Sequence, residues 1–157
     1  MVIEMKDGRL TVGGQTLFTG LSFRVKGGDV LYIDHLPPHA NTTLMHVLMG
    51  LLPLDEGVVS IDGEPMNELS AAWLRRHIGY VPNRLRWPDD ERFKGLSDRD
   101  VHQLLMENAA AGDSPIVLID GIYGASDEDL CRRMAQSGRA VVACREQLES
   151  NTGNDDE

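Results

Sequence analysis

The residues best placed to do chemistry lie where an apolar strand, expected at 29–34, leads into a helix that is expected to begin near Asn41. The connection reads DHLPPHANT, and its last residue, Thr42, brings a hydroxyl to the first turn of that helix. The first N–H groups of a helix have no partner inside it, and the helix dipole favours anions beside them. This arrangement indicates a place where a phosphate group could lie.

The same stretch has the strand–loop–helix setting of the phosphate-binding P-loop, G-x-x-x-x-G-K-[ST]. The slots of that pattern hold His35, Pro38, Ala40 and Asn41. Pro37 and Pro38 have no N–H to donate, and an asparagine stands at the lysine position, so that only Thr42 keeps its type. We therefore expect a plain strand–helix connection. The alternative is weak binding of ATP through the helix N-terminus and Thr42.

Seven segments follow one another in an order that is known from a single family. They are QTLFTGLSFRVKGGDVLYID (15–34), TTLMHVLMGLLPLDEGVVSIDGEPM (42–66), LRRHIGYVPN (74–83), LSDRD (96–100), SPIVLID (114–120), GASD (124–127) and AVVACRE (140–146). In this order they resemble the ATPase subunits of ABC transporters, from the strands before Walker A to the strand before the H-loop. The resemblance implies an α/β fold with a P-loop NTPase-like ABC ATPase core, in which a mixed parallel sheet with helices is joined by an antiparallel β subdomain.

The resemblance also assigns the Walker B positions. Asp120 matches the aspartate that holds magnesium through water, and Gly121 stands where the family has the glutamate that polarises the attacking water. Without that carboxylate there is no general base where hydrolysis needs one. If nucleotide binds at all, the vestigial site consists of Asn41, Thr42, Thr43 and Asp120. Otherwise Asp120 is simply an aspartate at a strand end.

The family's signature glycines, which offer N–H groups to the partner's ATP, are replaced here. The stretch holds Ser97, Asp98, Arg99 and Asp100. Serine followed three residues later by an acid predicts a helix N-cap of the capping-box kind. The two carboxylates would repel a phosphate by about 4 kcal/mol at close range. We expect the helix to remain for structural reasons while its role toward a ligand is lost.

The remaining family positions differ as well. Val12 stands near the place of the aromatic residue that stacks on adenine, Asn83 replaces the Q-loop glutamine, and Arg145 stands at the H-loop histidine. Only residues 84–95 separate Asn83 from the signature segment, where the family builds most of a helical subdomain. That subdomain is therefore expected to be largely deleted, with a short loop in its place.

Length, composition and charge narrow the class of protein. A chain of 157 residues can form one domain with a sizeable core, which we place at 1–145, followed by an acidic tail at 146–157 that is expected to be disordered. A net charge of −10 argues against nucleic-acid binding and against an anionic membrane surface. No apolar run is long enough to insert in a membrane, and two cysteines without metal spacing fit a cytoplasmic protein.

Early in the chain, apolar and polar residues alternate between predicted turns, and this pattern predicts antiparallel strands. Later apolar runs that are separated by helices predict a parallel sheet. We expect strands near 2–6, 9–12, 16–25, 29–34, 57–62, 77–81, 115–120 and 139–144, and helices near 41–50, 67–75, 97–111 and 126–137. In the first helix, the apolar residues at helical spacing are expected in the core. They are Leu44, Val47, Leu48 and Leu51.

A metal site at the histidines is the competing chemistry. His35, His39 and His46, with Asp34 beside the first, are residue types that bind metals. The proline-containing loop does not place them on one helix face, and no cysteine or glutamate supports them. We expect surface histidines and no metal.

Relative to the family, a residue needed for each catalytic step is thus replaced. These replacements predict a protein that is not an enzyme and needs no cofactor. We expect a scaffold or regulatory subunit that works through protein contacts with a transporter or membrane complex, in the cytoplasm or peripherally at the inner membrane. The alternative is a degenerate transport subunit that still binds ATP and Mg. The partner would be an ABC ATPase, a membrane-complex subunit or a second copy. The expected contact face holds His35, Pro37, Pro38, His39, Asp98 and Asp100.

Overall fold

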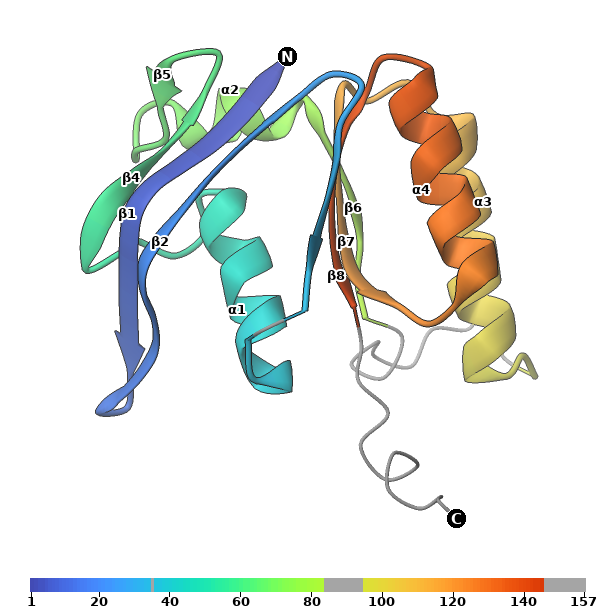
Figure 1. Cartoon of the computed structure of the whole chain (residues 1–157), viewed down its shortest axis with the longest axis horizontal. Helices are drawn as coiled ribbons and strands as arrows, with labels where there is room; N and C mark the ends of the chain where they lie inside the picture. The colour runs from blue at the N-terminus through green and yellow to red at the C-terminus, as the bar shows by residue number, and fades with distance from the viewer. Residues whose placement is uncertain (35, 84–94, 146–157) are drawn as a thin grey trace.

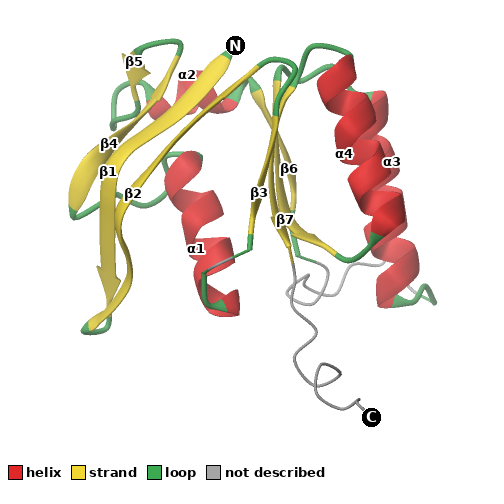
Figure 2. Ribbon diagram, viewed as in Figure 1, coloured by secondary structure: helices red, strands yellow, loops and turns green. Residues whose placement is uncertain are grey.

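The computed structural model describes residues 1–34, 36–83 and 95–145. These residues form two sheets and four helices, in the layers seen in Figures 1 and 2. The antiparallel sheet has the order β2-β1-β4-β5, and the parallel sheet has the order β3-β8-β7-β6. The expected α/β fold with one antiparallel and one parallel sheet is therefore confirmed. The predicted tail at 146–157 and most of the predicted loop at 84–95 lie outside the described residues.

The antiparallel sheet comes from the first half of the chain. It contains β1 (Val2–Val12), β2 (Gln15–Lys26), β4 (Glu56–Ile61) and the short β5 (Glu64–Pro65). The two strands that were expected at 2–6 and 9–12 are one strand, because the register shifts between Met5 and Leu10 let the chain bend without breaking the ladder. Asp7 has a φ of 53° at this irregularity. Strand β5 was not predicted.

The parallel sheet gathers strands from both ends of the described chain. It contains β3 (Val30–Ile33), β6 (Ile78–Val81), β7 (Ile116–Ile122) and β8 (Ala140–Arg145). All seven residues of β7 are buried, as expected for a strand that is covered on both faces. The carboxyl ends of these strands meet at one edge, which is where the polar residues of the candidate site lie.

Helices cover both faces of the parallel sheet. Figure 2 shows α1 (Pro38–Leu48) between the two sheets, with α3 (Asp98–Ala111) and α4 (Ala125–Gln136) on the other face. One core cluster joins α1 to both sheets, and a second lies between the parallel sheet and the α3–α4 pair. No helix among the described residues is long and apolar enough to cross a membrane.

Two helices differ from prediction. Helix α1 begins at Pro38, three residues before the expected start, because proline fits the first helical position, where no N–H is needed. Helix α2 (Ala71–Arg75) is shorter than the expected 67–75. The Asn67 side chain accepts hydrogen bonds from the backbone N–H groups of Leu69 (2.8 Å) and Ser70 (3.0 Å), and this turn occupies the place of the first helical turn.

The core prediction for α1 is mostly confirmed. Leu44, Val47 and Leu48 are buried, but Leu51 is 56% exposed, so the prediction for that residue is wrong. The helix has ended before Leu51, and Gly50, in a left-handed conformation (φ 75°), turns the chain away from the helix direction. Helical spacing therefore no longer applies at that position.

Candidate functional site

The N-terminus of α1 lies at the carboxyl edge of the parallel sheet, where the sequence predicts an emptied phosphate loop. Pro37 is the N-cap residue, and neither it nor Pro38 has an N–H. The N–H of Ala40 already donates to the carbonyl of Pro37 at 2.8 Å. No side chain caps this end. The first turn therefore offers a phosphate few backbone donors. His35 lies outside the described residues.

Asn41 and Thr43, two of the predicted vestigial residues, do not face an open loop. Asn41 is buried, and its Oδ1 atom accepts no hydrogen bond from a described residue. Thr43 donates to the carbonyl of His39 at 3.4 Å within the helix.

The structure brings together Thr42 and Asp120, the two residues at the positions where the resemblance would place magnesium binding. The Thr42 hydroxyl donates to Oδ2 of Asp120 at 2.6 Å, and the Tyr80 hydroxyl approaches the same oxygen at 3.4 Å. Asp120 is 1% exposed. The two groups are hydrogen-bonded to each other.

Gly121, at the position of the missing glutamate, is part of a small network that sequence reasoning did not find. Its φ of 135° is one that side-chain-bearing residues rarely adopt, and the β7–β8 register is irregular around it. Tyr123 donates its hydroxyl to Oδ1 of Asn83 at 3.0 Å, directly above this glycine. The Q-loop position is therefore tied to the Walker B strand. No local spacing in the sequence signals this contact.

Arg145, at the H-loop position, connects three elements. Its guanidinium bonds Glu128 of α4 and Asp34 at the end of β3, each at 3.2 Å, and lies 4.1 Å from the ring centroid of Tyr32. Burial lowers the pKa of Arg145, but the two carboxylates outweigh that effect and raise it. The arginine thus fastens β8 to its neighbours. The separation of these residues in the sequence concealed the cluster.

The signature helix is capped as predicted, because the Ser97 hydroxyl accepts a hydrogen bond from the N–H of Asp100 at 3.1 Å. Asp98 and Asp100 are exposed in the first turn. Figure 1 shows the N-terminal ends of α1 and α3 at the same end of the molecule. Of the predicted contact face, Pro37, His39, Asp98 and Asp100 therefore lie at one end, and the side chain of Pro38 is not among those that the structure describes.

A buried pair joins α3 to α4 and was not predicted. His102 Nε2 and Asp127 Oδ2 are 2.7 Å apart, and the same carboxylate oxygen accepts the N–H of Tyr123 at 2.9 Å. The His102 and Tyr123 rings meet edge to face with centroids 5.0 Å apart. These contacts fix the turn before α4 against the signature helix.

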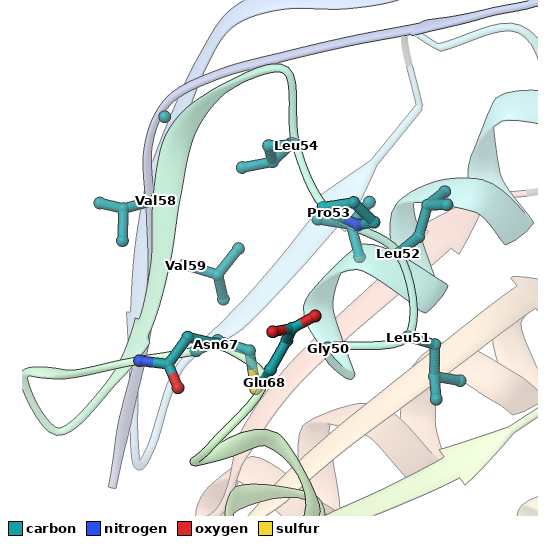
Figure 3. Close-up of a pocket in the computed structure, with 12 residues that line it drawn as sticks. Gly50, Leu51, Leu52, Pro53, Leu54, Val58, Val59, Asn67 and Glu68 are labelled. Carbon is teal, nitrogen blue, oxygen red and sulfur yellow. The ribbon is translucent and has the colours of Figure 1, made fainter.

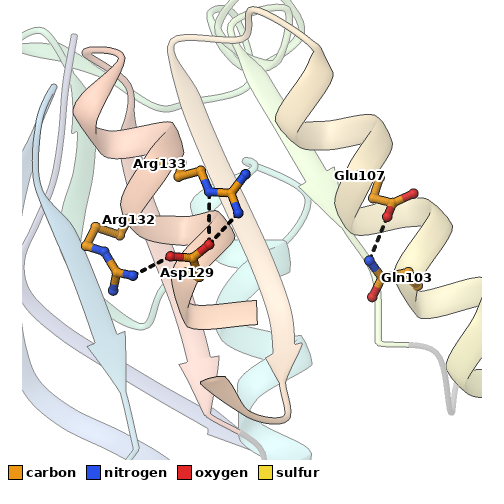
Figure 4. Close-up of polar contacts among 5 residues, drawn as sticks. All are labelled: Gln103, Glu107, Asp129, Arg132 and Arg133. Carbon is orange, nitrogen blue, oxygen red and sulfur yellow. Dashed lines mark hydrogen bonds and ion pairs between the residues drawn. The ribbon is translucent and has the colours of Figure 1, made fainter. Parts of the chain in front are cut away.

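The outer faces of α3 and α4 carry only local polar contacts. Figure 4 shows Asp129 between Arg132 and Arg133, and Gln103 donating to Glu107 at 2.7 Å one turn away. Contacts at such spacing stabilise a helix by roughly 0.2–0.5 kcal/mol per pair. They lie on solvent-facing surfaces of the two helices.

Among the described residues there is neither a cluster of three metal-binding side chains nor an aromatic side chain at position 12. In 1–34, 36–83 and 95–145, no three His, Cys, Asp or Glu side chains group as they would around a metal ion. Val12 is exposed at the end of β1 and offers no aromatic face. Burial raises the pKa of the Cys131 thiol to about 12, which leaves the thiol protonated and unreactive.

Comparison with known proteins supports the assignment of the fold and the family. No protein-family model matches the chain. The cytochrome c biogenesis ATP-binding export protein CcmA of Idiomarina loihiensis is 38% identical over 142 residues, covering 85% of this chain and 60% of that protein. The ribose import ATP-binding protein RbsA of Geobacillus kaustophilus is 41% identical over 99 residues, covering 62% of this chain and 18% of that protein.

A solved structure shows the same fold. A putative ABC transporter ATP-binding protein from Pyrococcus furiosus superposes with a TM-score of 0.71 at 12% identity, covering 94% of this chain and 93% of that one. The proteins compared are ABC transporter ATP-binding subunits, and the chain is accordingly an ABC ATPase-like protein. It spans 17%, 60% and 18% of the length of the first three of its curated relatives.

Proposed function

We propose that the chain is a catalytically inactive ABC ATPase-like protein that acts as a scaffold or regulatory subunit through protein–protein contacts. The observation that carries this proposal is the start of α1, where Pro37 and Pro38 stand in the phosphate loop and Asn41 is buried. A P-loop holds phosphate through backbone N–H groups and a lysine. This helix start has no lysine at that position, and two of its residues have no N–H to donate.

Two further positions support inactivity. Gly121 supplies no carboxylate beside Asp120, so a water molecule there would have no general base. Asp98 and Asp100 place negative charge at the helix that would receive the partner's ATP. In an ABC dimer with an active subunit, both shared sites would then be impaired, which favours a structural role over a transport role.

The proposed partner follows from the names of the relatives. Their names describe import and export ATP-binding proteins, and we infer a transporter or membrane complex as the partner, reached from the cytoplasmic side. Pro37, His39, Asp98 and Asp100 would lie on the contact face. The double substitution Asp98→Lys/Asp100→Lys should weaken capture of such a partner, and unchanged capture would exclude this face.

A degenerate subunit that still binds nucleotide is the second candidate. The 2.6 Å contact between Thr42 and Asp120 favours it, because the two magnesium-side groups remain together. A magnesium ion could replace the hydrogen bond between them without a large movement. In that case the chain would bind Mg-ATP weakly and support transport beside an active subunit.

Calorimetric titration with Mg-ATP distinguishes the two candidates. A ligand at a hundred times its Kd stabilises a fold by about 2.7 kcal/mol, so a thermal-shift series gives an independent reading. We expect no heat and no shift at millimolar nucleotide. Binding that is abolished in both Thr42→Ala and Asp120→Ala would instead establish the nucleotide-binding subunit.

A further inference from the structure

The segment from Glu64 to Trp73, which includes β5 and the start of α2, lies at the end of the molecule opposite the N-terminus of α1 (Figure 1). Two apolar hollows are lined in part by residues of this segment. The first hollow, of about 510 Å³, lies between β4 and the loop that follows α1. Its main lining residues are Leu51, Leu52, Leu54, Val59, Met66 and Glu68. The second, of about 470 Å³, is lined by Met1, Ile61, Asp62, Glu64, Trp73 and Leu74, with Ser70.

The segment from Glu64 to Trp73, which we call the ridge, presents two large apolar side chains to solvent. Leu69 is 96% exposed and Trp73, four residues later, is 54% exposed. Exposed apolar side chains that gather in this way, beside hollows, mark interaction sites more often than scattered ones do. Tryptophan is also among the residue types that dominate binding energy at interfaces.

This ridge is held rigidly. Besides the two hydrogen bonds that Asn67 accepts, the Ser70 hydroxyl donates to the carbonyl of Pro65 at 2.7 Å and accepts from the N–H of Asn67 at 3.0 Å. Leu69 therefore stands on an ordered turn. A partner that buries it would lose little conformational entropy in ordering the turn.

The charged side chains that line the hollows are all acidic, although Met1, which carries the N-terminal ammonium group, also lines the second hollow. Figure 3 shows the Glu68 carboxylate over the first hollow, and Glu64 lines the second. Among the residues that the structure describes, neither carboxylate makes an ion pair, and no Lys or Arg lines either hollow. The surface thus combines apolar hollows with unpaired negative charge.

We propose that the ridge from Glu64 to Trp73 and its two hollows dock a cationic amphipathic helix of a partner protein. Apolar side chains of that helix would enter the hollows beside Leu69, and its Lys or Arg side chains would pair with Glu64 and Glu68. A second copy of this chain is a poor occupant, because a symmetric contact would set like carboxylates against each other between two chains of net charge −10.

This inference deepens the proposed scaffold function by giving its partner a chemistry and a surface. The two can fail separately, because Mg-ATP binding would favour the nucleotide-binding subunit over the scaffold without bearing on this ridge. Failure of a cationic helix to bind would exclude the ridge as a docking site and would leave the result for nucleotide unchanged.

The test uses the full chain and a synthetic peptide of about fourteen residues with leucines at helical spacing and lysines between them. In a Trp87→Phe background, Trp73 is the single tryptophan and its emission reports contact at the ridge. Backbone amide shifts map the site. We expect saturable binding with changes at residues 50–54 and 64–74, and none with a peptide that carries glutamate in place of lysine.

Matched variants decide whether the binding is specific. Glu64→Lys/Glu68→Lys should weaken the peptide's affinity about tenfold or more, because two attractive charges become repulsive. Glu107→Lys/Asp113→Lys makes the same change of net charge on and beside α3 and should leave the affinity within about twofold. Leu69→Ser should weaken binding, whereas Leu104→Ser, exposed on α3, should not.

Three results would overturn the proposal. They are no binding, equal binding of the glutamate peptide, and equal weakening by the two pairs of lysine substitutions. Concentration-dependent self-association that perturbs residues 64–74 would assign the ridge to a second copy of the chain.

Discussion

A Cβ atom added at Gly121 would lie 3.1 Å from the phenolic oxygen of Tyr123, the atom that donates to Asn83. Restoring a carboxylate by Gly121→Glu should therefore destabilise the fold by about 1–3 kcal/mol through backbone strain alone, and it should not restore hydrolysis. Urea unfolding measures the cost. Gly124→Ala is the control, because Gly124 has an extended φ of 172° and open space around it. Equal stability of the two variants would contradict this prediction.

The hydrogen bond from Thr42 to Asp120 should contribute to stability even without a ligand. Thr42→Val keeps the shape of the side chain and removes the donor to a buried carboxylate, which costs about 1.5–3 kcal/mol. Thr43→Val, one residue further along, removes a weaker and more exposed contact and should cost within about 0.5 kcal/mol. Chemical denaturation of both variants provides the comparison, and similar losses would mean that the buried contact is not special.

Arg145 should stabilise the fold in a salt-dependent way. Arg145→Met removes its bonds to Asp34 and Glu128 and the charge over Tyr32, a loss of about 1 kcal/mol for a partly exposed cluster. The loss should shrink in about 1 M salt, where charges are screened over roughly 3 Å. Arg132→Met, on the outer face of α4, is the control and should have little effect. A loss that is unaffected by salt would point to packing instead.

Asp129 should make stability depend on acid pH. Hydrogen bonding from Arg133, ahead of the other influences, holds the pKa of Asp129 below its ordinary value of 3.8. A carboxyl with a lowered folded pKa contributes stability that is fully present above the unfolded value and is lost as pH falls from 3.8 through the folded pKa. Asp129→Asn should flatten the stability curve in that acid window, as measured by denaturation at several pH values. Parallel curves for the two proteins would refute the assignment.

Local chemistry could be predicted from the sequence. The prolines that lack donors lie at the helix start, Ser97 caps its helix, and the later apolar runs form a parallel sheet. Each of these depends on residues that are close together in the chain, where propensity and spacing act directly. The early antiparallel sheet was likewise predictable from alternation and turns.

Contacts between distant side chains could not be predicted. Arg145 meets Asp34 across 111 positions, and Tyr123 reaches Asn83 across 40. The His102–Asp127 pair depends on how α3 packs on α4, which no periodicity within either helix determines. Such contacts depend on tertiary packing, which spacing within one segment does not determine.

The strand order of the parallel sheet has a consequence for synthesis on the ribosome. Strand β3 pairs with β8, and Val30 lies opposite Val141. This strand pair therefore cannot form until nearly all of the described chain has been synthesised. Strands β1 and β2 pair through a short hairpin and can form while translation continues. Pairing of distant strands is slow because a long loop must close first. We therefore expect the insertion of β8 between β3 and β7 to come late in folding, and we expect the apolar face of α1 to stay exposed in the nascent chain until then.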